Sequence, residues 1–199
     1  LLCFHVSGWN TVLHQLICAV AKSQQKLCLL AGAGFLLLEE LSHEFAEIHG
    51  THHPIKQLRE QNRLIMINPQ EQEEHVKIQA AIKAGYAFVV MADPGDVFER
   101  EDVYHCQIRS RHIPIHTSLL DLLSFHGVSV QTLFHYWRED HALALEFSSI
   151  HQAQNVQTSQ CDMTALHKAV FNPIASRLST CLFQWANLSV FSDKQSRRR

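Results

Sequence analysis

The first twenty residues, Leu1–Val20 (LLCFHVSGWNTVLHQLICAV), join an apolar run to a helical pattern through one short polar turn. The run 1–5 predicts a buried strand, and the apolar residues of 9–20 recur at helical spacing and form one stripe. Ser7 is a residue type that caps helix N-termini. The sequence therefore predicts a strand that delivers His5 to a Ser-Gly turn, with an amphipathic helix directly after it.

Strands and helices continue to alternate through the first half of the chain. Asn68 is a predicted N-cap, followed by Pro69 at the first helical position, and Gly85 is a predicted helix stop. Apolar runs predict buried strands at 26–31, 63–68 and 86–92, and periodic patterns predict helices at 35–48 and 69–84, with a loop and room for a turn of helix at 49–61. This alternation is typical of right-handed βαβ units and a parallel sheet.

The second half has a different pattern. It predicts a half-exposed strand at 103–109, a short helix at 117–125 that stops at Gly127, and a hairpin of 128–137 with 142–149. A Gln-rich connector at 152–160 precedes one or two helices at 163–191, interrupted near Pro173. The predicted fold class is α/β: a mostly parallel central sheet flanked by helices, with a late antiparallel hairpin, in one domain over residues 1–199.

Composition and charge narrow the function classes. The 199 residues are 46% hydrophobic and carry a formal net charge of −2, without a basic stripe, so nucleic acid is not an expected partner. No run reaches the roughly 18 apolar residues of a membrane span. The six cysteines are scattered, which fits a reducing compartment better than a disulfide framework. The chain starts inside an apolar strand, so we expect its native N-terminus to lie upstream of Leu1.

His5 is the sharpest candidate for catalysis. A histidine titrates near neutral pH, and a partner in the first helical turn can orient one ring nitrogen and leave the other for a substrate hydroxyl. Asn10 occupies that partner position, where an amide orients the ring but does not stabilise the imidazolium. In a serine protease triad, loss of the acid with the geometry retained costs roughly 10⁴ in rate. The alternative is that His5 is a capped histidine at a strand end.

Other side chains could contribute to a site or to structure alone. His5, the region Arg59–Arg63 and Asp93 lie near strand or loop ends, and ligands of open α/β sheets bind at the carboxyl ends of strands. Arg63, however, sits at the start of its predicted strand, and Asp93 starts an Asp-Pro-Gly turn. The sequence contains no G-x-S-x-G elbow and no H-E-x-x-H motif, so it does not predict a serine or cysteine nucleophile.

A zinc site is a third hypothesis from the sequence. Its candidate ligands have suitable types and spacing on and after the predicted helix 35–48. They are Glu44, Glu47, His49, His52 and His53.

The block His5-Val6-Ser7-Gly8-Trp9-Asn10 resembles the H-x-x-x-x-D/E motif of the lysophospholipid acyltransferase superfamily, and most closely its bacterial lipid A lauroyl/myristoyl acyltransferase branch. Residues 82–93 resemble that family's Lys-Gly, apolar strand and Asp block. Residues 117–149 resemble its small helix, turn and paired strands, and Trp185 resembles the Trp of its C-terminal segment. The chain departs from the family at Asn10, which replaces the acid, and at Pro94, which replaces a glutamine.

The resemblance implies transfer of a fatty acyl group from an acyl-CoA or acyl carrier protein thioester to a hydroxyl or amine of a lipid-like acceptor. His5 would be the general base and Asn10 its partner, with no covalent enzyme intermediate. Arg59, Arg63 and Asp93 are the expected substrate-binding residues, and the thioester is a co-substrate rather than a resident cofactor. The expected location is the cytoplasmic side of a membrane, as a peripheral protein. The alternative is a degenerate relative that binds a lipid or a protein.

Overall fold

The computed structural model describes residues 2–3, 9–30, 43, 46–47, 50, 54–68, 73–91, 103–152, 163–181 and 184. Within this part the chain is an α/β protein with a small parallel sheet of three strands, antiparallel hairpins and helices. Its contacts divide it into two compact units: Leu1 with Trp9–Met91, and Leu2–Gly8 with Ala92–Arg199. The prediction of one domain over 1–199 stays a prediction.

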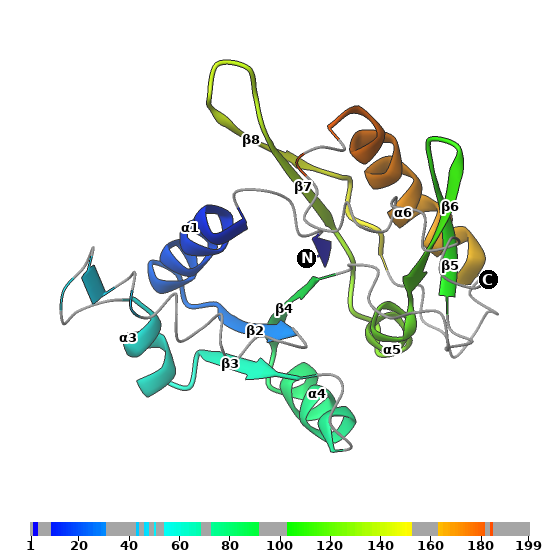
Figure 1. Cartoon of the computed structure of the whole chain (residues 1–199). Helices are drawn as coiled ribbons and strands as arrows, with labels where there is room; N and C mark the ends of the chain where they lie inside the picture. The colour runs from blue at the N-terminus through cyan, green and yellow to red at the C-terminus, as the bar shows by residue number, and fades with distance from the viewer. Residues whose placement is uncertain are drawn as a thin grey trace, which may run out of the picture. The chain divides into compact units, whose positions relative to one another are not determined.

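The sheet of the first unit contains three parallel strands, with β2 between the other two (Figure 1). These are β2 (Lys26–Leu30), β3 (Leu64–Ile67) and β4 (Tyr86–Met91). β2 is buried from Leu27 to Leu30. A central parallel strand is covered on both faces, which explains its uninterrupted apolar sequence. The three strands predicted at 26–31, 63–68 and 86–92 are confirmed.

The helices α1, α3 and α4 lie within the described residues of this unit, and each of them buries a short apolar set. α1 (Trp9–Ala21) buries Val12, Leu13 and Ile17, which confirms the predicted stripe. α1 contacts α3 (Pro54–Glu60), while α4 (Glu74–Lys83) contacts β3 and β4. The buried residues of α3 and α4 are Ile55, Leu58, Ile78 and Ala81.

Two predictions in the first unit need correction. The segment 49–61 contains a helix that runs from Pro54 to Glu60, because proline fits the first helical turn and Ile55 and Leu58 fall on one face. α4 has Glu73, not Asn68, at its N-cap position, so the predicted cap was wrong. The predicted stop is confirmed, since Gly85 follows α4 with φ +75°. Most of the predicted helix 35–48 lies outside the described residues.

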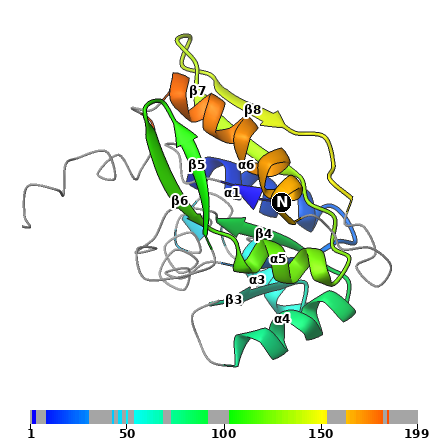
Figure 2. The same cartoon turned by 90° about the vertical axis from the view of Figure 1, so that its right-hand side faces the viewer.

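The described part of the second unit combines two hairpins with two helices. β1 (Leu2–Cys3) pairs in parallel with β7 (Thr132–Trp137), which pairs antiparallel with β8 (Leu143–Phe147). β5 (Val103–Ile108) and β6 (Arg111–His116) form the other hairpin. The helices are α5 (Ser118–Phe125) and α6 (Met163–Thr180). In both views α6 lies between the hairpins (Figure 1, Figure 2), and it contacts β5 and β7.

Most predicted elements of this unit are confirmed: the strand at 103–109, the helix at 117–125 and the hairpin across 138–141. Gly127 ends α5 with φ +76°. The strand β6 was not predicted. It follows β5 through Arg109 and Ser110, and Arg109 has φ +55°, a conformation that glycine usually supplies in such turns.

α6 continues through Pro173, so the predicted interruption is wrong. Proline removes the hydrogen bond to the carbonyl four residues earlier, that of Ala169. Both Pro173 and Ala169 are exposed, so water can satisfy this carbonyl. The buried residues Val170, Phe171 and Ile174 hold the opposite face of the helix in place.

Candidate functional site

His5 and its neighbours in the chain, residues 4–8, lie outside the described residues. β1 ends at Cys3 and α1 begins at Trp9, so His5 lies in the connection between a strand and a helix, outside the described residues. Asn10 is the second residue of α1. Asp93 also lies outside the described residues, beyond the end of β4. The predicted contact between His5 and Asn10 therefore stays a prediction.

The two arginines lie in different environments. Arg63 precedes β3, at the amino ends of the parallel strands, and its guanidinium donates to the backbone carbonyls of Val20, Ser23 and Gln25. The Nη2–O distance to Val20 is 2.7 Å. Arg63 thus ties the end of α1 to the start of β2. Arg59 lies in the last turn of α3, and its side chain is exposed to solvent, unlike that of Arg63, which is half-buried.

The zinc hypothesis gains no support from the described residues. Among them, no three His, Cys, Asp or Glu side chains are grouped closely enough to hold a metal ion. Glu47 is exposed, while Glu44, His49, His52 and His53 lie outside the described residues.

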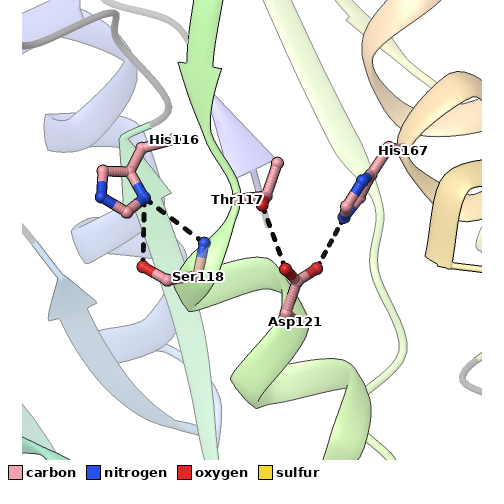
Figure 3. Close-up of polar contacts among 5 residues, drawn as sticks. All are labelled: His116, Thr117, Ser118, Asp121 and His167. Carbon is pink, nitrogen blue, oxygen red and sulfur yellow. Dashed lines mark hydrogen bonds and ion pairs between the residues drawn. The ribbon is translucent and has the colours of Figure 1, made fainter. Parts of the chain in front are cut away.

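A cluster of polar side chains surrounds the junction of β6 and α5, within the second unit (Figure 3). β6 ends at His116, Thr117 occupies the N-cap position, and Ser118 is the first residue of α5. His116 and Ser118 lie on one side of this junction, and Thr117, Asp121 and His167 lie on the other (Figure 3). The contacts described below therefore fall into two groups, one on each side of the junction.

The first contact is a carboxylate bonded by two donors from different elements. Asp121 Oδ2 accepts from the Thr117 hydroxyl at 3.0 Å, and Asp121 Oδ1 is 2.6 Å from Nε2 of His167. The backbone N–H of Asp121 also donates to the Thr117 carbonyl at 2.9 Å. Since His167 belongs to α6, this network fixes the first turn of α5 to α6.

The second contact pairs a hydroxyl with an imidazole. Ser118 Oγ lies 3.1 Å from Nδ1 of His116, and the Ser118 backbone N–H donates to the same nitrogen at 3.4 Å. A backbone N–H can only donate, so Nδ1 is the unprotonated nitrogen of the ring and the ring proton is on Nε2. The Ser118 hydroxyl accordingly donates to His116. This is the contact that a general base makes with an alcohol nucleophile.

Aromatic side chains border the Asp121–His167 pair. The rings of Tyr104 and Phe171 stack with centroids 5.6 Å apart, and the His167 ring lies 5.9 Å from that of Tyr104. The Tyr104 hydroxyl donates to Asn172 at 2.8 Å. Burial and the nearby Cys106 raise the pKa of Tyr104, so the phenol stays neutral at physiological pH. The Asp121–His167 pair is therefore anchored against an apolar wall.

A pocket of about 570 Å³ opens elsewhere in the second unit, between the β7–β8 turn and the end of α6. Its walls include Phe134, Tyr136 and Arg177. Two polar pairs brace it: Arg177 Nε lies 2.7 Å from Glu146, and the side chain of Gln184 exchanges hydrogen bonds with the Trp137 backbone. The Tyr136 hydroxyl donates to Glu146, and this bond raises the pKa of the phenol.

Sequence reasoning missed the cluster at the start of α5. Its one local signal was His116 directly before a predicted helix whose second residue is a serine. The partnership of Asp121 with His167 spans 46 positions and carries no local signal.

Comparison with known proteins gave no match, neither to a family model nor to a curated relative. In the described part of the chain no helix is long and apolar enough to cross a membrane.

Proposed function

We propose that this protein is an acyltransferase that moves a fatty acyl group from a thioester donor to a hydroxyl or amine of a lipid-like acceptor. The observation that carries the proposal is the place of His5 in the chain: between β1, which ends at Cys3, and α1, which starts at Trp9. A histidine at the carboxyl end of a strand lies where open α/β sheets bind ligands.

The order of the later elements supports the same proposal. The small helix α5, its stop at Gly127 and the paired strands β7 and β8 follow one another as the resemblance to lysophospholipid acyltransferases leads us to expect. In this mechanism His5 removes the proton of the acceptor, whose oxygen or nitrogen attacks the thioester carbonyl. The thiol of the donor leaves as the new acyl bond forms.

The substrate-binding residues of the proposal follow from the described contacts. Arg59 is exposed and is available to an anionic donor or acceptor. Arg63 is committed to three backbone carbonyls, so its contribution would be to hold α1 and β2 in place. Asp93 remains a proposed site residue. A peripheral position at the cytoplasmic side of a membrane would bring the protein to a lipid acceptor.

Asn10 favours a second candidate function. An amide cannot stabilise the imidazolium that forms on His5, and an acyltransferase scaffold without its acid is suited to binding rather than turnover. The protein would then bind a lipid or a protein partner.

One experiment separates the two functions. The purified chain is incubated with acyl-CoA or acyl carrier protein thioesters and a panel of lysolipid and sugar-lipid acceptors, and acylated product is measured by mass spectrometry. We expect wild type to transfer acyl groups, His5→Ala to lose at least about 100-fold in rate, and His112→Ala, an exposed histidine of β6, to retain it. Activity gained only in Asn10→Asp would favour the binding module. Equal activity in wild type and His5→Ala would overturn the catalytic proposal.

A further inference from the structure

The contact between Ser118 and His116 has the geometry of an activated nucleophile. The Ser118 hydroxyl donates its proton toward Nδ1 of His116 over 3.1 Å, and the backbone N–H at 3.4 Å excludes a proton on that nitrogen. A general base must lie within about 2.6–3.2 Å of the proton donor that it serves, and this pair meets the condition before any substrate binds.

Exposure distinguishes Ser118 from the neighbouring hydroxyls. Ser118 and His116 are half-buried, whereas Thr117 and Ser124 are 3% and 2% exposed. Ser118 is therefore more accessible than the other two. Thr117 is further committed to Asp121. Ser124, on the same helix, provides a matched control residue.

The surroundings hold this pair in place. The Thr117–Asp121–His167 network fixes the first turn of α5 to α6 on the opposite side of the junction from Ser118 and His116 (Figure 3). A nucleophile on a rigid element is already held in its reactive position, so little conformational entropy of its side chain is lost when it reacts. Asp121 and His167 are thus positioning residues for this pair.

We propose that Ser118 is the nucleophile of an ester- and thioester-cleaving activity, with His116 as its general base. Ser118 Oγ attacks the acyl carbonyl carbon as its proton moves to Nδ1 of His116. The bond from the carbonyl carbon to sulfur or oxygen breaks, and the leaving thiol or alcohol takes that proton. Water then attacks the acyl-serine, gives a proton to Nδ1, and releases the carboxylic acid and the Ser118 hydroxyl.

This activity shares its class of donor with the proposed function but does not use His5. Its base, nucleophile and supporting network all belong to residues 116–121 and 167. The two proposals therefore fail or succeed separately.

The test uses the full chain with a fluorophosphonate probe, which reacts covalently with activated serines, and with p-nitrophenyl butyrate as the ester. We expect the probe to label Ser118, as located by peptide mass spectrometry, and ester cleavage to begin with a burst of p-nitrophenol. Ser118→Ala should abolish both signals. Ser124→Ala should leave both unchanged.

A second variant separates the catalytic role of His116 from a structural one. In His116→Asn the side-chain oxygen can still accept the Ser118 N–H, because asparagine caps helix starts well, but it is not a base. We expect His116→Asn to keep the far-ultraviolet circular dichroism and melting temperature of wild type and to slow labelling by about 10²–10⁴-fold.

Three results would overturn the proposal: no labelling of the wild type, labelling at a residue other than Ser118, or equal labelling in wild type and folded His116→Asn. Labelling of Ser118 in a chain that transfers no acyl group to any acceptor would support this proposal while the proposed function fails.

Discussion

The guanidinium of Arg63 links two elements that follow one another in the chain. It donates to carbonyls at the end of α1 and before β2, so one charged side chain serves three backbone acceptors. Hydrogen bonds from a charged group contribute about 1.5–3 kcal/mol each when buried, and the half-buried position of Arg63 reduces this. A structural role at the amino ends of the strands explains these contacts without a substrate.

We expect Arg63→Ala to lower the free energy of unfolding by about 2–4 kcal/mol, because the backbone carbonyls that accept hydrogen bonds from the guanidinium lose a charged donor. Urea denaturation followed by circular dichroism measures the change. Arg59→Ala is the matched control, since this arginine is exposed at the end of α3, and we expect a change within about 0.5 kcal/mol. An Arg63→Ala protein as stable as wild type would contradict the structural role.

At the scale of the element, α6 is the helix whose sequence conflicts most with its structure. Pro173 lies inside it, yet the helix runs unbroken from Met163 to Thr180. The buried residues on either side of the proline, Phe171 and Ile174, outweigh its local preference. Tertiary packing outweighs the low helix propensity of proline here, as it commonly outweighs helix propensity in proteins.

We expect Pro173→Ala to stabilise the protein by about 1–2 kcal/mol, because alanine restores the hydrogen bond to the Ala169 carbonyl and suits a helix interior. This would raise the melting temperature by about 2–8 °C. Ser176→Ala, on an exposed position of the same helix, should change stability by no more than about 0.5 kcal/mol. A lower melting temperature for Pro173→Ala would contradict the expectation that the proline destabilises α6.

The strands that could be predicted are those in which the buried residues are contiguous in sequence. β2 is an example, because it is buried over Leu27–Leu30 and forms an apolar run. The end of α5 could be predicted as well, because a glycine with positive φ follows it. β6 gave no such signal, because it contains Pro114 and alternates with histidines. Its turn also places Arg109 at φ +55°, and the contacts of Arg109 with Ser179, 70 positions away, support that conformation.

The residues of the candidate sites also differ in how far the sequence could predict them. His5 could be selected from a local pattern of strand, histidine, turn and helix. The described residues include the strand and the helix of that pattern, while the histidine and the turn lie outside them. The pairing of Ser118 with His116 depends on the direction of two side chains at a strand-to-helix junction, which periodicity does not encode. The pairing of Asp121 with His167 depends on how α5 and α6 pack.

At the scale of the whole molecule, each unit buries a thiol in its core. Burial and the nearby Glu74 raise the pKa of Cys28 in the first unit from 9.0 to about 12, and burial raises that of Cys106 in the second unit to about 11. Above pH 9 the unfolded chain loses these protons while the folded chain keeps them. Stability contributed by the two thiols is therefore complete below pH 9 and falls as pH rises.

We expect the free energy of unfolding to decrease between pH 9 and pH 11 by up to about 1.4 kcal/mol per pH unit for each buried thiol. Urea denaturation at pH 8 and pH 10.5 measures this slope. Cys28→Ala and Cys106→Ala should each flatten it, although both lose buried volume. Val89→Ala, which removes volume beside β2 without removing a titratable group, should keep the slope of wild type. If the two cysteine variants keep it as well, the thiols are not protected by the folded cores, and the burial of Cys28 and Cys106 in both units would have to be reconsidered.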